Sequence, residues 1–230
     1  MEGHLPSSCP EEQLPPLTQL PQLTNLYLRL IDSVCEHVAR DWEPQEPELR
    51  DRDYIMNDLN RYIKKFWPKA ELTLFGSSSN GFAFRHSDLD ISLTFRDVQT
   101  SANLDCISLI EELSERIKRM VGMRNVVAIT SAKVPIVKLF HHQCQIEADI
   151  SLYNVLGKFH LICLNSSISP TTPARENTRL LSLYADLDPR CRTLGYMVKL
   201  FAKICDIGDA SRGSLSSYAY ILMMIFYLQV

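Results

Sequence analysis

Two aspartates separated by a single residue are candidates for binding a metal ion together. Asp88 and Asp90 lie in the run SDLDISL, where apolar residues occupy the alternate positions. In a β-strand this alternation places both carboxylates on one face and the apolar side chains on the other. Like charges side by side on a sheet are destabilising by up to about 1 kcal/mol, and a divalent ion such as Mg²⁺, which prefers carboxylate oxygens, would relieve the repulsion. The alternative is an exposed strand edge that carries two solvated aspartates.

A third acidic residue stands in a second strand-like run, IEADISL, further along the chain. Asp149 has apolar neighbours on both sides and would share a strand face with Glu147. An aspartate on a buried strand needs a partner, because an unpaired charge is costly to bury. If the two strands are neighbours, Asp149 would lie near Asp88 and Asp90. Three converging carboxylates suit two-metal phosphoryl transfer, in which the ions lie about 4 Å apart.

The segment Phe75–Ser78 adds a group of a different kind, a glycine and serines directly after a predicted strand. Glycine lets the backbone come close to a ligand, and the N–H groups of a helix start can hold phosphate oxygens together with a serine hydroxyl. We expect such a helix to open near Asn80. Gly76-Ser77 is therefore a candidate phosphate site, although on its own a glycine and a serine after a strand also form an ordinary turn.

The surrounding segments must position these residues, and their patterns predict an α+β fold. Residues 1–23 contain five prolines and no periodicity and are expected to be flexible. Thr24 is expected to cap a helix that runs to Trp42, and a second helix is expected over 49–66, before Pro68. Short apolar runs predict strands and one periodic stretch predicts a helix: the strands are 71–75, 89–95, 125–129, 135–140 and 145–152, and the helix is 106–121.

The remainder of the chain, from Asn177 onward, is predicted to be helical, with pieces at 180–184, 193–205 and 215–228. Residues 157–174 have the pattern of a loop, and it is longer than such connections usually are. The apolar stretch 215–230 is too short and too interrupted by polar residues to cross a bilayer. It is expected to be a buried helix.

The amino-acid composition excludes only a few classes of protein. The chain has 230 residues, 46% of them hydrophobic and 22% charged, with a net charge of −3, as in an ordinary globular protein. The charge gives no overall signal for nucleic acid, although a local basic groove is compatible with it. The seven cysteines are odd in number and form no CxxC pair, which argues against a disulfide framework and against zinc in this chain. A reducing compartment follows, and the N-terminal segment lacks the apolar core of a signal peptide.

The motifs in combination resemble a known family. Gly76-Ser77, Asp88 and Asp90, and then Asp149 resemble the DNA polymerase β-type nucleotidyltransferase superfamily. Five longer runs resemble the noncanonical poly(A) polymerases of this superfamily, and among them the zinc-knuckle terminal uridylyltransferases. The resemblance extends over about residues 24–229. The runs are FGSSSNGFAFRHSDLDISL (75–93), TSAKVPIVK (130–138), NTRLL (177–181), LGYMVKLFAK (194–203) and GDASRGSLSSYAYILM (208–223).

The resemblance implies a domain organisation. A nucleotidyltransferase palm, a mixed β-sheet with helices on one side, would cover 48–156. A helix within 24–47 would pack on a truncated all-helical central domain at 175–230, and 157–174 would be an atypical inserted loop. The family's helical domain continues further, so the last helix here would expose the apolar face of Ile221, Phe226 and Leu228. The loop and the end at Val230 both fit read-through of an intron start, which sequencing the transcript against genomic DNA would test.

The resemblance also implies roles for individual residues. Asp88 and Asp90 would hold both Mg²⁺ ions, with Mn²⁺ as an alternative, and Asp149 would ligate the catalytic ion. The nucleotide-binding residues would be Gly76 and Ser77 for the triphosphate, Asn177 for the ribose or base, Lys199 and Lys203 for the β- and γ-phosphates, Ser217 for a phosphate and Tyr218 for stacking on uracil. Lysines four apart share one helix face. The alternatives are a solvated lysine face and a tyrosine that belongs to the core.

The implied function is template-independent transfer of UMP from UTP to an RNA 3′ end in the cytoplasm, with accessory RNA-binding proteins as further partners. Two alternatives remain open. One is a poly(A) polymerase of the same family that prefers ATP. The other is a truncated, inactive chain that binds RNA or protein.

Overall fold

The computed structural model describes residues 22–98, 104–132, 134–153 and 173–229. The chain divides into two compact units, Met1–Val34 and Cys35–Val230. Helix α1 (Asn25–Trp42) begins in the first unit, where the Thr24 hydroxyl accepts a hydrogen bond from the Tyr27 N–H at 3.2 Å. The predicted cap and extent of this helix are confirmed. Its predicted packing on the helical domain, like the limits of the domains, stays a prediction.

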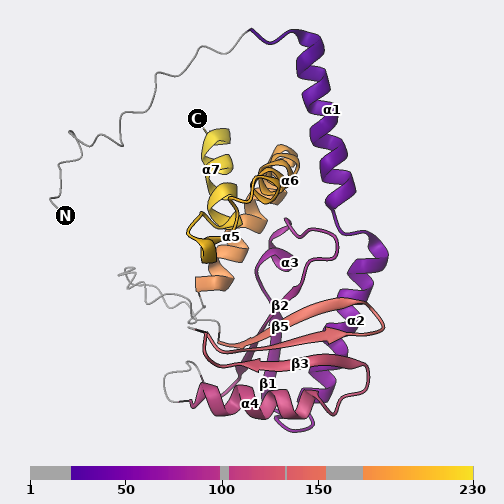
Figure 1. The fold of residues 1–230 in the computed structure, drawn as a ribbon, viewed down its shortest axis with the longest axis vertical. Coiled ribbons are helices and arrows are strands. Elements are labelled where there is room, and N and C mark those ends of the chain that lie inside the picture. Colours follow the sequence, from indigo (N-terminus) through magenta and orange to yellow (C-terminus); the bar gives the residue numbers. More distant parts are fainter. Residues whose placement is uncertain (1–21, 99–103, 133, 154–172, 230) are drawn as a thin grey trace, which may run out of the picture. The chain divides into compact units, whose positions relative to one another are not determined.

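A five-stranded mixed sheet forms the centre of the second unit (Figure 1). The strands are β1 (Ala70–Leu74), β2 (Leu89–Phe95), β3 (Met123–Ile129), β4 (Ile136–His141) and β5 (Ile146–Leu152), in the order β1-β2-β5-β4-β3. Strands β2 and β5 are parallel and every other pair is antiparallel. The sheet therefore places side by side two strands that are distant in sequence.

Helices α2 (Glu46–Ile63) and α4 (Cys106–Ile117) form the main core with the sheet. Their inward residues recur every three or four positions, as an amphipathic helix requires. The core is made of α2 residues (Ile55, Leu59, Ile63), α4 residues (Ile110, Leu113, Ile117) and the alternating apolar residues of the two central strands (Leu89, Ile91, Leu93, Ala148, Ile150, Leu152). Because strand side chains alternate, the polar residues of β2 and β5 face away from this core. The predicted α+β class is confirmed.

Several helix predictions were wrong in their boundaries. The helices expected over 106–121, 180–184 and 193–205 span Cys106–Ile117, Pro173–Leu187 and Pro189–Ile204. Helix α2 begins at Glu46, three residues before the prediction, because Pro47 lies in the first turn, where a missing N–H is tolerated. The helix expected to open near Asn80 instead ends there: α3 is a single turn, Ser77–Asn80, and Gly81 follows with φ +85° in the left-handed region.

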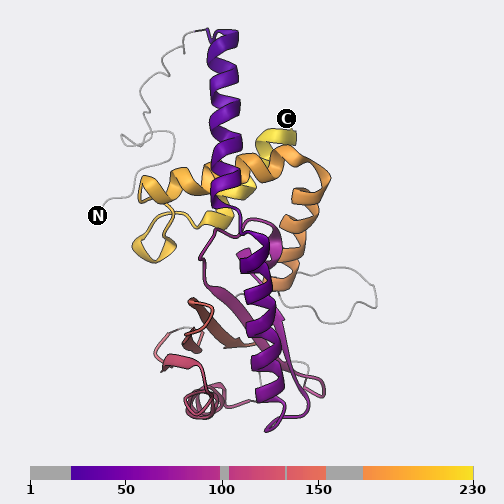
Figure 2. The ribbon, with the colours of Figure 1, turned by 90° about the vertical axis from the view of Figure 1, so that its right-hand side faces the viewer.

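The C-terminal part consists of α5 (Pro173–Leu187), α6 (Pro189–Ile204), the 3₁₀ turn η3 (Ala210–Arg212) and α7 (Ser217–Gln229) (Figure 2). Its core contains Leu181 of α5, Ile221 of α7 and Phe82, which lies between α3 and β2. The prediction that Ile221 is exposed was wrong, since this side chain is 2% exposed, whereas Phe226 is 68% exposed. Of the predicted loop 157–174, positions up to 172 lie outside the described residues, and Pro173 and Ala174 begin α5.

No helix within the described ranges is both long enough and apolar enough to cross a membrane. Helix α7, the most apolar one, has 13 residues, whereas a spanning helix needs about 20.

Candidate active site

The acidic residues predicted to act together lie on adjacent strands. In the parallel pair β2–β5 the backbone position of Asp90 is directly opposite Asp149, and neighbouring strands lie about 4.8 Å apart. The buried residues Leu89 and Ala148 form the preceding pair and point into the core. Asp88 immediately precedes β2 and alternation places it on the same face as Asp90. The structure thus brings all three predicted carboxylates to one face of the sheet.

A lysine from a third strand lies among these acidic groups. On β4, Lys138 is the register partner of Asp149. Its Nζ lies 2.7 Å from Glu147 Oε2, 3.6 Å from Asp88 Oδ2 and 3.8 Å from Asp149 Oδ1. Asp88 and Asp149 therefore lie close to one and the same nitrogen atom. Lys138 supplies the positive charge that a row of carboxylates requires.

Burial and mutual repulsion shift the protonation of two of these carboxylates. The pKa of Asp90 is raised to about 6, first by burial and then by the negative charges of Asp149 and Asp88. The pKa of Asp149 is also raised by burial, against the lowering effect of Lys138. Both shifts have the sign expected for like charges held together away from water.

The acidic residues fit a divalent cation. Within the described part of the chain, the buried Oδ1 of Asp149 has no hydrogen-bond partner, and an unsatisfied buried carboxylate oxygen is costly. Carboxylate oxygens are the donors that Mg²⁺ prefers. Over the same residues, no three acidic, histidine or cysteine side chains stand as a ready-made metal site, and Lys138 is paired with Asp88 and Asp149 instead. An ion bound by these two carboxylates would take over the role of the ammonium.

The turn between β1 and α3 approaches the acidic residues so closely that only glycine fits. Gly76 has φ +64°, and a Cβ at this position would lie 2.5 Å from Asp90 Oδ2. The Gly76 N–H donates a hydrogen bond to Thr178 Oγ1 of α5 at 3.0 Å. The turn therefore joins the carboxylates to the C-terminal helices, and Ser77 is the next residue.

A cavity of about 350 Å³ opens beside Asp90, within the usual range for a small-molecule site. It contains seven of the ten predicted site residues: Gly76, Ser77, Asp90, Asn177, Lys199, Ser217 and Tyr218. Its other lining residues are Phe75, Asn80, Phe82, Thr178, Leu181, Ser216 and Ile221. Polar groups from the palm and from α5, α6 and α7 thus converge on one space.

The two predicted lysines have different environments. Lys199 donates a hydrogen bond to the Phe82 carbonyl at 2.7 Å, and its Nζ lies 4.4 Å from the centre of the Phe84 ring. Burial lowers the pKa of Lys199 to about 8, and Asp90 opposes that shift. Lys203 is exposed, with its Nζ 5.8 Å from the Phe84 ring and 5.4 Å from the Trp42 ring. Both lysines therefore lie on the same face of α6, as their spacing predicts.

A second cavity, of about 310 Å³, adjoins the first and shares Lys199 and Ser217 with it. It is also lined by Lys203 and Arg212. The lining also includes Asp206 and Asp209, which are ion-paired with Arg212. Lys199, Lys203 and Ser217 are therefore the groups of this cavity that can meet the negative charge of a long ligand.

Three residues contribute to the site without having been predicted: Lys138, Thr178 and Phe82. Lys138 is the only charged residue in the run VPIVKLF. A single charge in an apolar strand is a signal from which its role in the site could have been predicted. Thr178 stands beside Asn177 in a motif that was noted without assigning it a role. Phe82 acts through its carbonyl group, which no side-chain pattern reveals.

Two proteins of known activity align with nearly the whole chain. It is 46% identical to human terminal uridylyltransferase 7 over an alignment of 232 positions, which covers 99% of this chain and 14% of that protein. It is 32% identical to poly(A) RNA polymerase GLD2-B of Xenopus laevis over 208 residues, 90% of this chain and 35% of that protein. The chain thus spans a minor part of the length of each.

Solved structures share the fold. The chain matches a cytoplasmic RNA terminal U-transferase with a TM-score of 0.69 at 27% identity, covering 87% of this chain and 54% of the other. The Cid1 poly(U) polymerase with Mg and 3′-dATP bound gives a TM-score of 0.68 at 27% identity, covering 87% and 55%.

One protein family matches more than half of the chain. Residues 31–166 match the family described as poly(A) RNA polymerase, mitochondrial-like, central palm domain. This range contains all three carboxylates and the Gly76 turn. This family match, together with the similarity to terminal uridylyltransferase 7, shows that the chain belongs to the noncanonical poly(A) polymerase and terminal uridylyltransferase family.

Proposed function

We propose that this chain transfers UMP from UTP to the 3′-hydroxyl of an RNA and releases pyrophosphate. The observation that carries the proposal is the position of Asp88, Asp90 and Asp149 on one sheet face, beside a cavity lined by hydroxyl, lysine and tyrosine side chains. Phosphoryl transfer depends mostly on positioning and charge neutralisation, and these groups can supply both.

The three aspartates would hold Mg²⁺. When bound, the metal would lower the pKa of the attacking hydroxyl and neutralise charge on the phosphates. Asp90 and Asp149 hold their carboxylates side by side on adjacent strands. The fold therefore presents carboxylate oxygens in a fixed row before any ligand arrives.

The cavity residues would bind the nucleotide. Lys199 and Lys203 present ammonium groups from one helix face, suited to the β- and γ-phosphates. Ser77 and Ser217 can donate hydroxyl hydrogen bonds to phosphate oxygens. Tyr218 lines the cavity and has an aromatic face for the base, an interaction of about 1–3 kcal/mol. Asn177, at the same cavity, would contact the ribose or base.

The choice of uridylate rests on the relatives. Terminal uridylyltransferase 7 is 46% identical and GLD2-B is 32% identical. We propose a cytoplasmic RNA as the acceptor, since one matching structure is of a cytoplasmic RNA terminal U-transferase. Single-stranded RNA is commonly held by its backbone and by stacking.

A second candidate function is poly(A) addition from ATP. It is favoured by the likeness to the poly(A) polymerase GLD2-B, which extends over 90% of this chain. The same carboxylates and lysines would serve, and only the base contacts would differ.

A primer-extension assay separates these functions. The 230-residue chain is incubated with a fluorescent RNA primer, Mg²⁺ and each of the four nucleoside triphosphates in turn. We expect extension with UTP, loss of extension with EDTA, and loss in Asp149→Ala. Asp53→Ala is the matched control, since Asp53 is an exposed aspartate on α2.

The outcomes distinguish UMP transfer, AMP transfer and a chain without enzymatic activity. Extension mainly with ATP supports the second candidate. No extension with any nucleotide by a chain that is folded by circular dichroism rejects both enzymatic functions for this chain. Equal extension by wild type and Asp149→Ala rejects the assigned carboxylates.

A further inference from the structure

An arginine on α2 is buried near the candidate active site. Arg52 lies on α2 and is 4% exposed. Burying a guanidinium is costly unless its N–H donors are paired. The partners of Arg52 therefore indicate what this group holds in place.

The guanidinium binds both ends of one segment, Ser78–Ser87, which begins within α3 and continues through the residues before Asp88 (hereafter the loop). Its Nη1 donates to Ser78 Oγ at 3.2 Å, at the start of the loop. Its Nη2 donates to the Ser87 carbonyl at 2.9 Å and lies 3.3 Å from Ser87 Oγ, at the end of the loop. A longer bond, 3.4 Å, reaches the Phe84 carbonyl between them. One side chain thus closes the segment from Ser78 to Ser87.

Both ends of this loop adjoin proposed ligand-binding residues. Ser78 follows Ser77, and Ser87 precedes Asp88. In addition, Ser78 Oγ donates to the Asp88 carbonyl at 3.3 Å. The Arg52 guanidinium is therefore one residue away from a proposed phosphate-binding group on one side and from a proposed metal ligand on the other.

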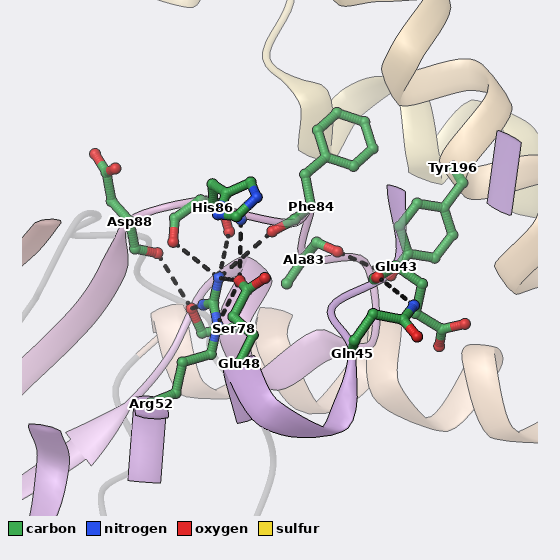
Figure 3. A network of polar contacts seen from close by, with 11 residues as sticks. Glu43, Gln45, Glu48, Arg52, Ser78, Ala83, Phe84, His86, Asp88 and Tyr196 are labelled. Atoms are coloured by element: carbon green, nitrogen blue, oxygen red, sulfur yellow. Dashed lines mark hydrogen bonds and ion pairs between the residues drawn. The ribbon is translucent and has the colours of Figure 1, made fainter. Parts of the chain in front are cut away.

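Glu48, one turn earlier on α2, completes the network (Figure 3). Its Oε1 accepts from Arg52 Nη2 at 2.7 Å and from Arg52 Nε at 3.2 Å. The same oxygen accepts from the His86 N–H at 3.0 Å. His86 has φ +59°, a conformation that non-glycine residues adopt only when their surroundings hold them there. Figure 3 shows Glu48 and Arg52 side by side beneath the loop.

The loop in turn supports the proposed nucleotide site. Its Phe82 carbonyl accepts from Lys199 at 2.7 Å, and its Phe84 ring lies under the Lys199 ammonium. The Tyr196 hydroxyl of α6 donates to the Ala83 carbonyl at 2.8 Å. A shift of the loop would therefore move Lys199 and Asp88 relative to each other.

We propose that Arg52, together with Glu48, is a positioning residue for the catalytic site. It sets the distance between the Asp88 metal ligand, the Ser77 turn and the Lys199 ammonium by closing the loop from Ser78 to Ser87. This inference rests on the proposed function for its kinetic consequence, but its effect on ligand binding can be measured without catalysis.

A purely structural salt bridge predicts a different outcome. It would lower thermal stability without changing how metal and nucleotide bind well below the melting temperature. A positioning role predicts weakened Mg²⁺-dependent binding in a chain that remains folded. Arg52→Lys distinguishes the two, since lysine keeps the charge but a single ammonium cannot span Ser78 and Ser87 together.

The experiment measures binding of a fluorescent, non-hydrolysable UTP analogue by polarisation over a series of Mg²⁺ concentrations. We expect Arg52→Lys to raise the half-saturating Mg²⁺ concentration about 10- to 100-fold, and to lower kcat in primer extension more than it raises KM for UTP. Arg50→Lys is the matched control: Arg50 lies on the same helix and is exposed, with an ion pair to Glu46 at 3.9 Å. It should leave both quantities unchanged.

A second variant covers the case in which Arg52→Lys fails to fold. Ser78→Ala removes two bonds of the network, the one from Arg52 Nη1 and the one to the Asp88 carbonyl, and leaves the buried Arg52–Glu48 ion pair intact. It should raise the Mg²⁺ requirement about two- to tenfold. In the double variant the two effects should not add, because both residues act through the same loop.

The two hypotheses fail separately. A wild-type chain that binds the analogue with Mg²⁺ but extends no primer contradicts the proposed function alone. Unchanged Mg²⁺ dependence in folded Arg52→Lys and in Ser78→Ala, or the same change in Arg50→Lys, overturns the positioning role.

Discussion

The folded chain places the Asp90 carboxylate in an environment that disfavours its ionised form. Burial and the charges of Asp149 and Asp88 raise its pKa to about 6, so that in the metal-free protein the ionised form is destabilised. Lys138 relieves the repulsion at Asp88 and Asp149, from which its Nζ lies 3.6 and 3.8 Å away. The row of carboxylates therefore lowers the stability of the free chain, and a bound cation would restore it.

We predict that Asp90→Asn stabilises the chain in EDTA while it abolishes primer extension. The gain should be about 1–2 kcal/mol, below the full value of the pKa shift because the carboxylate is only partly buried. At this chain length that corresponds to a few degrees of melting temperature. Differential scanning calorimetry of both proteins at pH 7 measures it, and a less stable Asp90→Asn protein would contradict the electrostatic account.

The gain should also depend on pH in a defined direction. The pKa of folded Asp90, about 6, lies above the ordinary value of 3.8. Between these values the folded chain binds more protons than the unfolded chain, so this residue destabilises the wild type fully above pH 6 and less as the pH falls. The difference in melting temperature between Asp90→Asn and wild type should accordingly shrink between pH 6 and pH 4.

At the scale of elements, the site depends on how β1, β2 and β5 are connected. The parallel pairing of β2 with β5 places Asp90 opposite Asp149, and the turn after β1 passes directly over the Asp90 carboxylate. Gly76 is needed there both for its positive φ and for the absence of a Cβ.

Gly76→Ala should reduce primer extension far more than it reduces stability, because the new methyl group would displace the Asp90 carboxylate. Gly122→Ala is the matched control: Gly122 has φ +90°, and a Cβ there would meet no atom within 4 Å. Gly122→Ala should lose about 1–2 kcal/mol from its positive φ. Gly76→Ala should lose somewhat more, because φ +64° with ψ −145° lies in a region that essentially only glycine adopts. Only Gly76→Ala should lose activity. Thermal melts and primer extension compare them, and equal activities would contradict the proposed close approach.

At the scale of the whole molecule, the cavity beside Asp90 is lined by the palm and by the C-terminal helices together. A ligand that fills it contacts Ser77 and Asp90 on one side and Lys199 and Tyr218 on the other. Binding should therefore stabilise both parts of the Cys35–Val230 unit, since a ligand that binds only the folded chain shifts the unfolding equilibrium.

We predict that Mg²⁺ and UTP together raise the melting temperature by about 5–10 °C at a hundredfold excess over Kd. Either one alone should have a smaller effect, because the triphosphate and the carboxylates repel each other without a cation between them. Differential scanning fluorimetry measures this. Asp149→Ala should show no added effect of Mg²⁺, and a full shift in that variant would argue against the assigned metal ligands.

The local features of the site could be predicted from residues that are close together in the sequence. Alternation at Asp88 and Asp90 and the apolar neighbours of Asp149 predicted two strands with carboxylates on one face, because the two-residue period of a strand is a local property. The spacing of Lys199 and Lys203 likewise predicted a shared helix face. These predictions agree with β2, β5 and α6.

Which elements meet could not be predicted in this way, because it depends on how the whole chain packs. That β5 lies beside β2, that Lys138 lies among the carboxylates and that Arg52 closes the loop before Asp88 all depend on contacts between residues distant in sequence. The raised pKa of Asp90 has the same origin, since burial and neighbouring charges exist only in the folded chain. Local patterns specify the face on which a side chain lies, and long-range packing specifies which groups it faces.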